Sequence, residues 1–311
     1  MADAAVSVVV CTRNRAAYLR DCLSSLVAGA LRDADEVLVV DNGSSDDTAA
    51  VATDAASRFR ALRYVFEPRA GLSHARNAGI EHATGEVLAY LDDDALVTPG
   101  WRDAVASAYA RWPDLGGLAG RVELRWRGPR PEWLAPRLET WYAGFDKGDR
   151  PRLLEADEYP FGANMSVRRD MATAIGGFAT ELGYVGRGLI GSEEREFFHR
   201  VMQKGGTLGY EPAALVYHQI GDARLTRRWL LRRTYSQGRA DARMERREGM
   251  ERRALLTSGL AAIGRGTARG WRADTQRTWR AENRASQLML TAAGRARRLG
   301  YGIEAVVTSF R

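Results

Sequence analysis

Long apolar runs are missing from this chain of 311 residues, and no stretch approaches the ~20 consecutive apolar residues that a membrane-spanning helix needs. The N-terminus lacks a positively charged start before its short apolar segment Val6–Cys11, so we expect no signal peptide. Cysteine is also scarce. Cys11 and Cys22 are the only two, and we expect both to be reduced core residues in a reducing compartment. Together these absences predict a cytoplasmic protein.

Lysine occurs only at positions 147 and 204, so nearly all of the basic charge is arginine. The net charge of +7 hides an asymmetry, because residues 1–220 carry 25 Lys and Arg against 31 Asp and Glu, whereas residues 221–311 carry 21 against 8. The composition, with 45% hydrophobic and 27% charged residues, is typical of a globular protein. The basic C-terminal region favours an anionic partner, either a membrane surface or a polyanion.

The first part of the chain alternates strand and helix patterns, which predicts an α/β fold with parallel strands. Ligands of such sheets bind at the carboxyl ends of the strands, and three of these ends are polar here, at residues 12–14, 41–43 and 92–94. The predicted strands are 6–10, 36–40, 62–66 and 87–91, and the predicted helices are 16–28, 44–59, 73–82 and 99–111.

The pattern is weaker from residue 116 to 217, and the region after Leu225 is predicted to be helical and rich in arginine. We expect that helical region to be interrupted at glycines near 249, 264–270 and 300. The middle region is predicted to contain strands at 118–124, 161–167 and 214–217, a loop with a short helix at 126–141, and a helix at 192–204.

Three consecutive aspartates, Asp92, Asp93 and Asp94, follow the fourth predicted strand. Adjacent carboxylates repel one another and are costly to bury without a partner, so a cation is expected there. Mg²⁺ and Mn²⁺ prefer oxygen ligands and commonly bridge carboxylates to phosphates. The alternative is an acidic loop before a helix in which Thr98 is the N-cap and Pro99 the first residue.

Other polar residues allow two interpretations each. Asp41 ends a predicted strand, where it could bind a ribose or a base, or form an Asx-turn. Arg69 and Arg76 lie near the start of a helix, where arginine binds diphosphates, although a solvated basic surface would look similar. His218 follows a strand and is either a ligand or a structural residue.

The segment Gly186-Arg-Gly-Leu-Ile-Gly191 matches a dinucleotide-binding pattern, but it follows no buried strand and runs into an acidic helix start. We therefore reject a dinucleotide site. Ser192 is predicted to cap that helix. Glu193 and Glu194 lie in its first turn, where they either complement the helix dipole or supply a general base.

Taken together, these motifs resemble the nucleotide-sugar glycosyltransferases of family 2, which have the GT-A fold: a Rossmann-like mixed sheet flanked by helices. The resemblance covers residues 6–218. It is carried by Val8-Val-Val-Cys-Thr-Arg-Asn-Arg15, Val39-Val-Asp-Asn-Gly-Ser-Ser-Asp-Asp-Thr48, Gly71-Leu-Ser-His-Ala-Arg-Asn-Ala-Gly-Ile80, Leu91-Asp-Asp-Asp94, Phe161-Gly-Ala-Asn-Met-Ser-Val-Arg168, Gly176-Gly-Phe178, Ser192-Glu-Glu194 and Val216-Tyr-His218.

The resemblance implies a donor site. Asp41 would bind the base or ribose of the nucleotide, and Asp92 or Asp93 would face the ribose and sugar. Asp92–Asp94 would be the DXD-like element, in which Asp94 binds Mn²⁺ or Mg²⁺, and His218 would be a further ligand of that metal. The other implied donor-binding residues are Thr12, Arg13, Arg69, Arg76 and Asn164.

The resemblance also implies an inverting reaction, in which Glu194 removes the proton of an acceptor hydroxyl. In family 2 this base belongs to a Glu-Asp pair. Here the pair is Glu193-Glu194, so the choice between the two glutamates stays open. The implied enzyme transfers sugar from a nucleoside-diphosphate sugar, with a UDP-sugar favoured, in the biosynthesis of a cell-surface glycan, glycolipid or secondary metabolite.

We expect residues 1–220 to form the catalytic domain, with a nucleotide-binding half at 1–115 and an acceptor half at 116–220, and residues 221–311 to form a basic helical region. The segment Leu225–Tyr235 mixes Trp and Leu with paired Arg, as interfacial helices do. It would dock on anionic lipid at the inner face of the plasma membrane, to reach a lipid-linked acceptor. Alternatively, these helices pack on the catalytic domain or form a homodimer.

Two other functions are compatible with the pattern. A sugar-phosphate nucleotidyltransferase would share the architecture but would need a glycine-rich basic loop after the first strand, where this chain has Thr12-Arg-Asn-Arg15. If the protein were a non-catalytic module that binds nucleotide sugars or polyanions, the three consecutive aspartates Asp92–Asp94 would have no function. No nucleic acid partner is expected.

Overall fold

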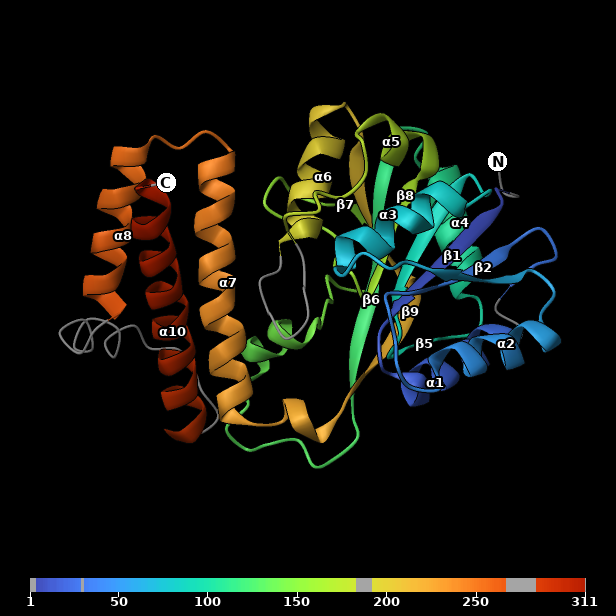
Figure 1. The fold of residues 1–311 in the computed structure, drawn as a ribbon, viewed down its shortest axis with the longest axis horizontal. Coiled ribbons are helices and arrows are strands. Elements are labelled where there is room, and N and C mark those ends of the chain that lie inside the picture. Colours follow the sequence, from blue (N-terminus) through green and yellow to red (C-terminus); the bar gives the residue numbers. More distant parts are fainter. Residues whose placement is uncertain (1–3, 29–30, 183–191, 267–283, 311) are drawn as a thin grey trace. The chain divides into compact units, whose positions relative to one another are not determined.

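The structure is a computed structural model that describes residues 4–28, 31–182, 192–266 and 284–310 (Figure 1). By their contacts the described residues form two units. Unit 1 lies within Met1–Arg125, Ala143–Leu182 and Glu193–Gln219, and unit 2 within Trp126–Tyr142, Gly183–Ser192 and Ile220–Arg311. The glycine pattern at 186–191 lies outside the described residues.

Unit 1 begins with the predicted alternation of strands and helices. Its first four strands are parallel and lie in the order β3-β2-β1-β4. Strands β1, β2 and β4 are built from short, mostly apolar and buried runs, as expected for parallel strands that are covered on both faces, whereas β3 is partly exposed at the edge of the sheet. The elements are β1 (Val6–Thr12), α1 (Ala16–Val27), β2 (Glu36–Asp41), α2 (Thr48–Arg58), β3 (Leu62–Phe66), α3 (Leu72–His82) and β4 (Val87–Asp92).

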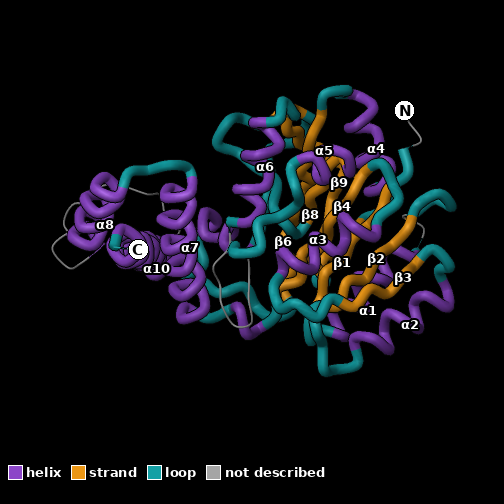
Figure 2. Tube along the Cα trace, turned by 45° about the horizontal axis from the view of Figure 1, so that its top comes forward, coloured by secondary structure: helices purple, strands orange, loops and turns teal. Residues whose placement is uncertain are grey.

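Antiparallel strands extend this sheet, which is therefore mixed, as predicted for the GT-A fold. In the described part of the chain the sheet has nine strands, in the order β3-β2-β1-β4-β8-β6-β9-β5, with β7 paired to β9 (Figure 2). The added elements are β5 (Ala95–Val97), α4 (Trp101–Arg111), β6 (Leu115–Trp126), β7 (Arg152–Leu153), β8 (Asn164–Arg168), α5 (Arg169–Ala174), α6 (Glu193–Gln203) and β9 (Thr207–Ile220).

Helices cover both faces of the sheet because strand residues alternate between two cores. Val6, Val8 and Val10 of β1 join one core with α1, α2 and α4, whereas Val9 joins the other core with α3, α5 and α6. Cys22 is buried in the first core, and neither cysteine is in a disulfide. The strand ends of β1, β2 and β4 are aligned, since Thr12 pairs with Asp41 and Cys11 with Asp92.

Three expectations for unit 1 were wrong in detail. Helix α4 begins at Trp101 rather than Pro99, and Gly100 takes the cap position in a left-handed conformation. Thr98 does not cap the helix, because its hydroxyl donates to the Leu215 carbonyl, 3.0 Å away, and fixes the chain against β9. Strand β9 is also longer than the predicted segment 214–217. Its extra length includes buried polar residues, which interrupt the apolar pattern.

Among its described residues, unit 2 contains the short 3₁₀ helix η1 (Pro136–Tyr142) and three long helices, α7 (Arg227–Arg247), α8 (Arg252–Gly266) and α10 (Arg284–Ser309). The predicted break near 249 is present, with Gly249 in a left-handed conformation after α7. The break near 264–270 falls at the end of α8, and residues 267–283 lie outside the described part of the chain.

The predicted interruption at Gly300 was wrong, because α10 continues through it. Gly300 serves close helix packing instead: a Cβ there would collide with the Tyr235 carbonyl oxygen of α7. Gly302 similarly lies against Gly259 of α8. Among the described residues, no helix combines the length and apolar character needed to cross a membrane.

Candidate active site

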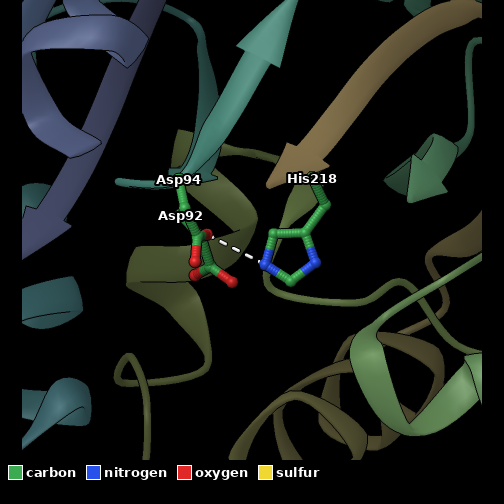
Figure 3. Close-up of side chains that lie close together, drawn as sticks. All are labelled: Asp92, Asp94 and His218. Atoms are coloured by element: carbon green, nitrogen blue, oxygen red, sulfur yellow. Dashed lines mark ion pairs between the residues drawn. The ribbon is translucent and has the colours of Figure 1, made fainter. Parts of the chain in front are cut away.

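Two acidic residues at the end of β4 meet a histidine from β9. Strand β5 follows Asp94 directly and pairs antiparallel with β9, so that Ala95 lies opposite His218. This pairing brings ligand atoms of Asp92, Asp94 and His218 within 4.8 Å of one another (Figure 3). The Nε2 atom of His218 is 2.9 Å from Oδ1 of Asp94, and both side chains are almost fully buried.

This cluster fits a divalent cation. Burial raises the pKa of Asp92, and the neighbouring Asp94 carboxylate raises it further. Burial also raises the pKa of Asp93 to about 7, against the opposing effect of Arg15. Buried carboxylates that resist ionisation side by side are stabilised by a cation, and two carboxylates with an imidazole could hold a metal ion.

The side chain of Asp93 contacts Thr12 and Arg15. Its Oδ2 accepts a hydrogen bond from the Thr12 hydroxyl at 2.8 Å, and its Oδ1 is 3.2 Å from Nη1 of Arg15. The Nη2 of Arg15 reaches Oδ2 of Asp94 at 2.5 Å. Thr12 was predicted at the site, but Arg15 was quoted only as part of a motif. Its position directly after a polar strand end was the available signal.

Asp41 lies at the end of β2 and is 2% exposed. Its Oδ1 accepts from the backbone N–H of Ser44 at 2.8 Å, so the Asx-turn is present. Its Oδ2 accepts from the Tyr64 hydroxyl at 2.8 Å. Tyr64 was missed by the sequence analysis, because a lone tyrosine in a strand is not distinctive. One carboxylate oxygen of Asp41 thus closes the turn, and the other accepts a hydrogen bond from an exposed tyrosine.

The predicted arginines lie in different environments. Arg13 is exposed after β1. Arg69 makes a two-point ion pair with Glu67, and the Asn42 side chain holds this turn by donating to the carbonyls of both residues. Arg76 is buried inside unit 1.

Arg76 pairs with both glutamates at the start of α6. Its Nη1 is 3.1 Å from Oε1 of Glu193, and its Nη2 is 2.9 Å from Oε1 of Glu194. The side chain of Glu193 is 0% exposed and that of Glu194 is 17% exposed. Glu194 also contributes to the raised pKa of Asp92, although less than burial and Asp94. The glutamate pair therefore lies within electrostatic reach of the acid cluster.

Gly162 supports this arrangement and was given no role by the sequence analysis. A Cβ on Gly162 would collide with Nη2 of Arg76 and with Oε1 of Glu194. Glycine is therefore required for the ion pair to lie against the backbone. Its place in the motif Phe161–Arg168 was the only signal in the sequence.

Asn164 is buried at the start of β8, and its amide is engaged within the sheet. Its Oδ1 accepts from the Trp101 indole at 3.0 Å, and its Nδ2 donates to the carbonyls of Arg121 and Ala214. These contacts join α4, β6 and β9 to β8. The predicted role of Asn164 in donor binding stays a prediction.

Comparisons with known proteins agree on one family. The model of glycosyl transferase family 2 matches residues 7–176. The chain is 29% identical over 236 residues to a glucosyl-dolichyl phosphate glucuronosyltransferase of Haloferax volcanii, covering 75% of each protein. It is 27% identical over 248 residues to the succinoglycan biosynthesis protein ExoM of Rhizobium meliloti, covering 77% of this chain and 74% of ExoM.

Solved structures agree on the fold. The mannosyltransferase PcManGT from Pyrobaculum calidifontis, in complex with GDP-Man and Mn²⁺, superposes with a TM-score of 0.58 at 21% identity. That match covers 98% of this chain and 86% of PcManGT. GalNAc-T7 with UDP, GalNAc and Mn²⁺ superposes with a TM-score of 0.54 at 16% identity, covering 77% of this chain and 51% of GalNAc-T7. The chain therefore belongs to glycosyltransferase family 2, and it is a transferase with the GT-A fold.

Proposed function

We propose that the protein is a metal-dependent, inverting glycosyltransferase that moves a sugar from a nucleoside-diphosphate sugar, preferably a UDP-sugar, to a hydroxyl acceptor. The observation that carries this proposal is the juxtaposition of Asp92, Asp94 and His218 with a glutamate pair held by Arg76. Metal site and base site then lie in one unit, at the carboxyl ends of parallel strands.

Asp94 and His218 would hold the cation, since their ligand atoms are already close and buried. When bound, a divalent ion offsets the negative charge that develops on a departing diphosphate. Asp92 would then face the sugar of the donor. Asp41 would accept a hydrogen bond from the nucleotide base or ribose, at the neighbouring strand end.

Glu194 is the better candidate for the general base, because its side chain is partly exposed whereas that of Glu193 is fully buried. Its oxygen would take the proton of the acceptor hydroxyl as that oxygen bonds to the anomeric carbon. The bond from the anomeric carbon to the diphosphate oxygen breaks in the same step, which inverts the anomeric centre. Glu193 and Arg76 would fix the direction of Glu194 rather than touch the donor.

The acceptor is proposed to be lipid-linked or to lie close to a membrane, in the synthesis of a cell-surface glycan, glycolipid or secondary metabolite. One relative is named for a dolichyl phosphate substrate. We further propose residues 1–220 as the catalytic domain. Within residues 221–311 the predicted docking segment Leu225–Tyr235 has Leu230 fully buried and half-buried Trp229 with its ring stacked on Tyr142, so these two side chains are engaged within unit 2.

A different surface of unit 2 therefore becomes the candidate for lipid contact. Ile303 and Val307 recur at helical spacing on one side of α10, Phe310 directly follows the helix, and all three are exposed. Exposed Leu260 lies on α8, which packs along α10 at Gly259. The strong positive charge of residues 221–311 favours an anionic bilayer and opposes a second copy of the same chain.

The central experiment is a screen of nucleotide sugars with and without Mn²⁺, measuring thermal stabilisation and release of nucleoside diphosphate. Metal-dependent stabilisation with slow diphosphate release is the expected result. Stabilisation without any release, in the presence of diverse hydroxyl acceptors, would favour the alternative of a non-catalytic nucleotide-sugar module. Pyrophosphate release from a nucleoside triphosphate and a sugar phosphate would favour a nucleotidyltransferase.

Lipid contact is tested by co-sedimentation of the full chain with vesicles of phosphatidylcholine, with or without phosphatidylserine. We expect sedimentation only with the anionic vesicles, and its loss in the double variant Ile303→Glu and Val307→Glu. Leu153→Glu, which changes an exposed leucine of unit 1, is the matched control. Binding that ignores the anionic lipid, or a dimer that the double variant dissolves, would contradict the lipid proposal.

A further inference from the structure

Arg15 occupies a special position beside the acid cluster. It directly precedes α1, and its guanidinium bridges two adjacent carboxylates through separate nitrogens, Nη1 to Asp93 at 3.2 Å and Nη2 to Asp94 at 2.5 Å. Such two-point pairing fixes a guanidinium better than a single contact does. The Tyr18 ring adds a third support, 4.4 Å from the guanidinium carbon.

The two oxygens of Asp94 consequently have different partners. Oδ1 lies 2.9 Å from Nε2 of His218, and Oδ2 is held by Arg15. Neighbouring ligands of an octahedral ion with bonds of ~2.1 Å are about 3 Å apart. The Asp94 and His218 atoms therefore already have the separation that two adjacent ligands of Mg²⁺ need, and only one oxygen of Asp94 is directed to that position.

We propose that Arg15 is a positioning residue that sets metal selectivity: by holding Oδ2, it restricts Asp94 to coordination through Oδ1. Ca²⁺ takes six to eight oxygens and often uses both oxygens of one carboxylate, whereas Mg²⁺ and Mn²⁺ accept octahedral sites. Keeping Asp94 to one oxygen therefore favours Mn²⁺ and Mg²⁺ over Ca²⁺. The inference rests on the proposed function only in taking Asp94 and His218 as metal ligands.

Asp93 has a different role from Asp94, because it holds Arg15 in place. Its Oδ2 is engaged by Thr12 and its Oδ1 by Arg15, so Asp93 anchors the guanidinium from the side opposite Asp94. Of the three consecutive aspartates, Asp94 is thus the metal ligand and Asp93 the anchor of Arg15.

Arg15 could instead act only through its charge, by offsetting the repulsion among the aspartates. The two explanations differ in their expectation for lysine, which keeps the charge but cannot bridge two carboxylates with a planar fork. Arg15→Lys should restore selectivity if charge suffices. It should behave like Arg15→Gln if the bridge is what matters.

The test measures Mn²⁺ and Ca²⁺ affinity of the full chain by calorimetry, without donor, for the wild type, Arg15→Gln and Arg15→Lys. Arg20→Gln, which removes an exposed charge from the same helix, is the control. We expect the ratio of the Ca²⁺ to the Mn²⁺ dissociation constant to fall about tenfold or more in both Arg15 variants, and to be unchanged in the control.

An unchanged ratio in Arg15→Gln, or full restoration by Arg15→Lys, would overturn the inference. Should Arg15→Gln fail to fold, as judged by circular dichroism, Tyr18→Leu loosens the guanidinium without removing the charge. A smaller fall in the ratio is then expected, and an unchanged ratio in both Tyr18→Leu and Arg15→Lys would also overturn it. Failure of the wild type to bind Mn²⁺ at all would instead refute the metal-dependent function.

Discussion

The guanidinium of Arg76 lies 2.9 Å from the carboxylate of Glu194, and both groups rest on a stretch of backbone that has no side chain, at Gly162. Glu194, the proposed base, is thereby fixed from two directions. Fixing a reacting group in this way reduces the reorganisation that accompanies reaction.

Replacing Glu194 with Gln is expected to lower the transfer rate by ~10²–10⁴-fold, the usual contribution of a general base. Donor affinity should be retained, because the substitution leaves the acid cluster intact. Steady-state kinetics and calorimetry with the donor separate the two effects. Glu193→Gln is the comparison, and a larger loss of rate there would transfer the role of base to Glu193.

Gly162→Ala is expected to lower the rate by about 10²-fold, because the new methyl group displaces the Arg76–Glu194 pair from its position. Donor binding and the melting temperature should change little by comparison. Gly294→Ala is the matched control, since a Cβ there meets nothing within 4 Å. Normal turnover in Gly162→Ala would show that the position of the pair is not needed for transfer.

Asp94→Ala is expected to abolish metal-dependent donor binding, because it removes the carboxylate whose two oxygens face His218 and Arg15. In the wild type, a ligand present at 100 times its dissociation constant stabilises the folded state by ~2.7 kcal/mol. Thermal melts with Mn²⁺ and donor, before and after adding a chelator, should therefore differ for the wild type and coincide for the variant. A metal effect that survives in Asp94→Ala would exclude this aspartate as a ligand.

Glu36 makes the stability of unit 1 sensitive to acid. Burial opposes its ionisation, but hydrogen bonds from Ser7, Thr84 and Arg63 outweigh burial and lower its pKa from 4.5 to about 2. A lowered folded-state pKa stabilises the fold fully above the unfolded value, and this contribution is lost as the pH falls from 4.5 to 2.

Glu36→Gln should therefore flatten the decline in the free energy of unfolding over that pH range, as measured by urea denaturation. Asp54→Asn, a change on the exposed side of α2, is the control and should keep the wild-type slope. Equal slopes for Glu36→Gln and the wild type would assign the acid sensitivity to other groups.

Gly300→Ala is expected to destabilise unit 2 by ~1–3 kcal/mol, the usual cost of forcing an extra group into a close contact. The Cβ would meet the Tyr235 backbone of α7. Gly294→Ala on the same helix should be neutral or slightly stabilising, since alanine favours helices. If both substitutions raise stability alike in denaturant titrations, then the close approach of α7 and α10 does not depend on glycine.

The alternation of strands and helices at the start of unit 1 was predictable because β1, β2 and β4 are short, mostly apolar runs flanked by polar residues. Strand β5 was not predictable, since three residues carry no periodicity. The helix interruption predicted near Gly300 was wrong, because a glycine that permits close helix packing cannot be told in sequence from one that ends a helix.

The motifs identified the candidate residues of the site but not their partners. The contact between Arg15 and Asp94 joins the start of α1 to the end of β4, and no local pattern encodes such a pair. Glu193 and Glu194 are chemically identical in sequence, and their different exposure arises only in the folded chain. The assigned roles in binding and catalysis stay predictions.

The three-residue strand β5 stands last in the sheet. Asp94 directly precedes it, and Ala95 lies opposite His218 on β9. A cation bound by both Asp94 and His218 would link β5 to β9 at that edge of the sheet, although the two residues are far apart in sequence. The amide protons of β5 should then exchange with solvent more slowly when the ion is bound, so the hydrogen-exchange rate of this strand would report whether the metal site is occupied.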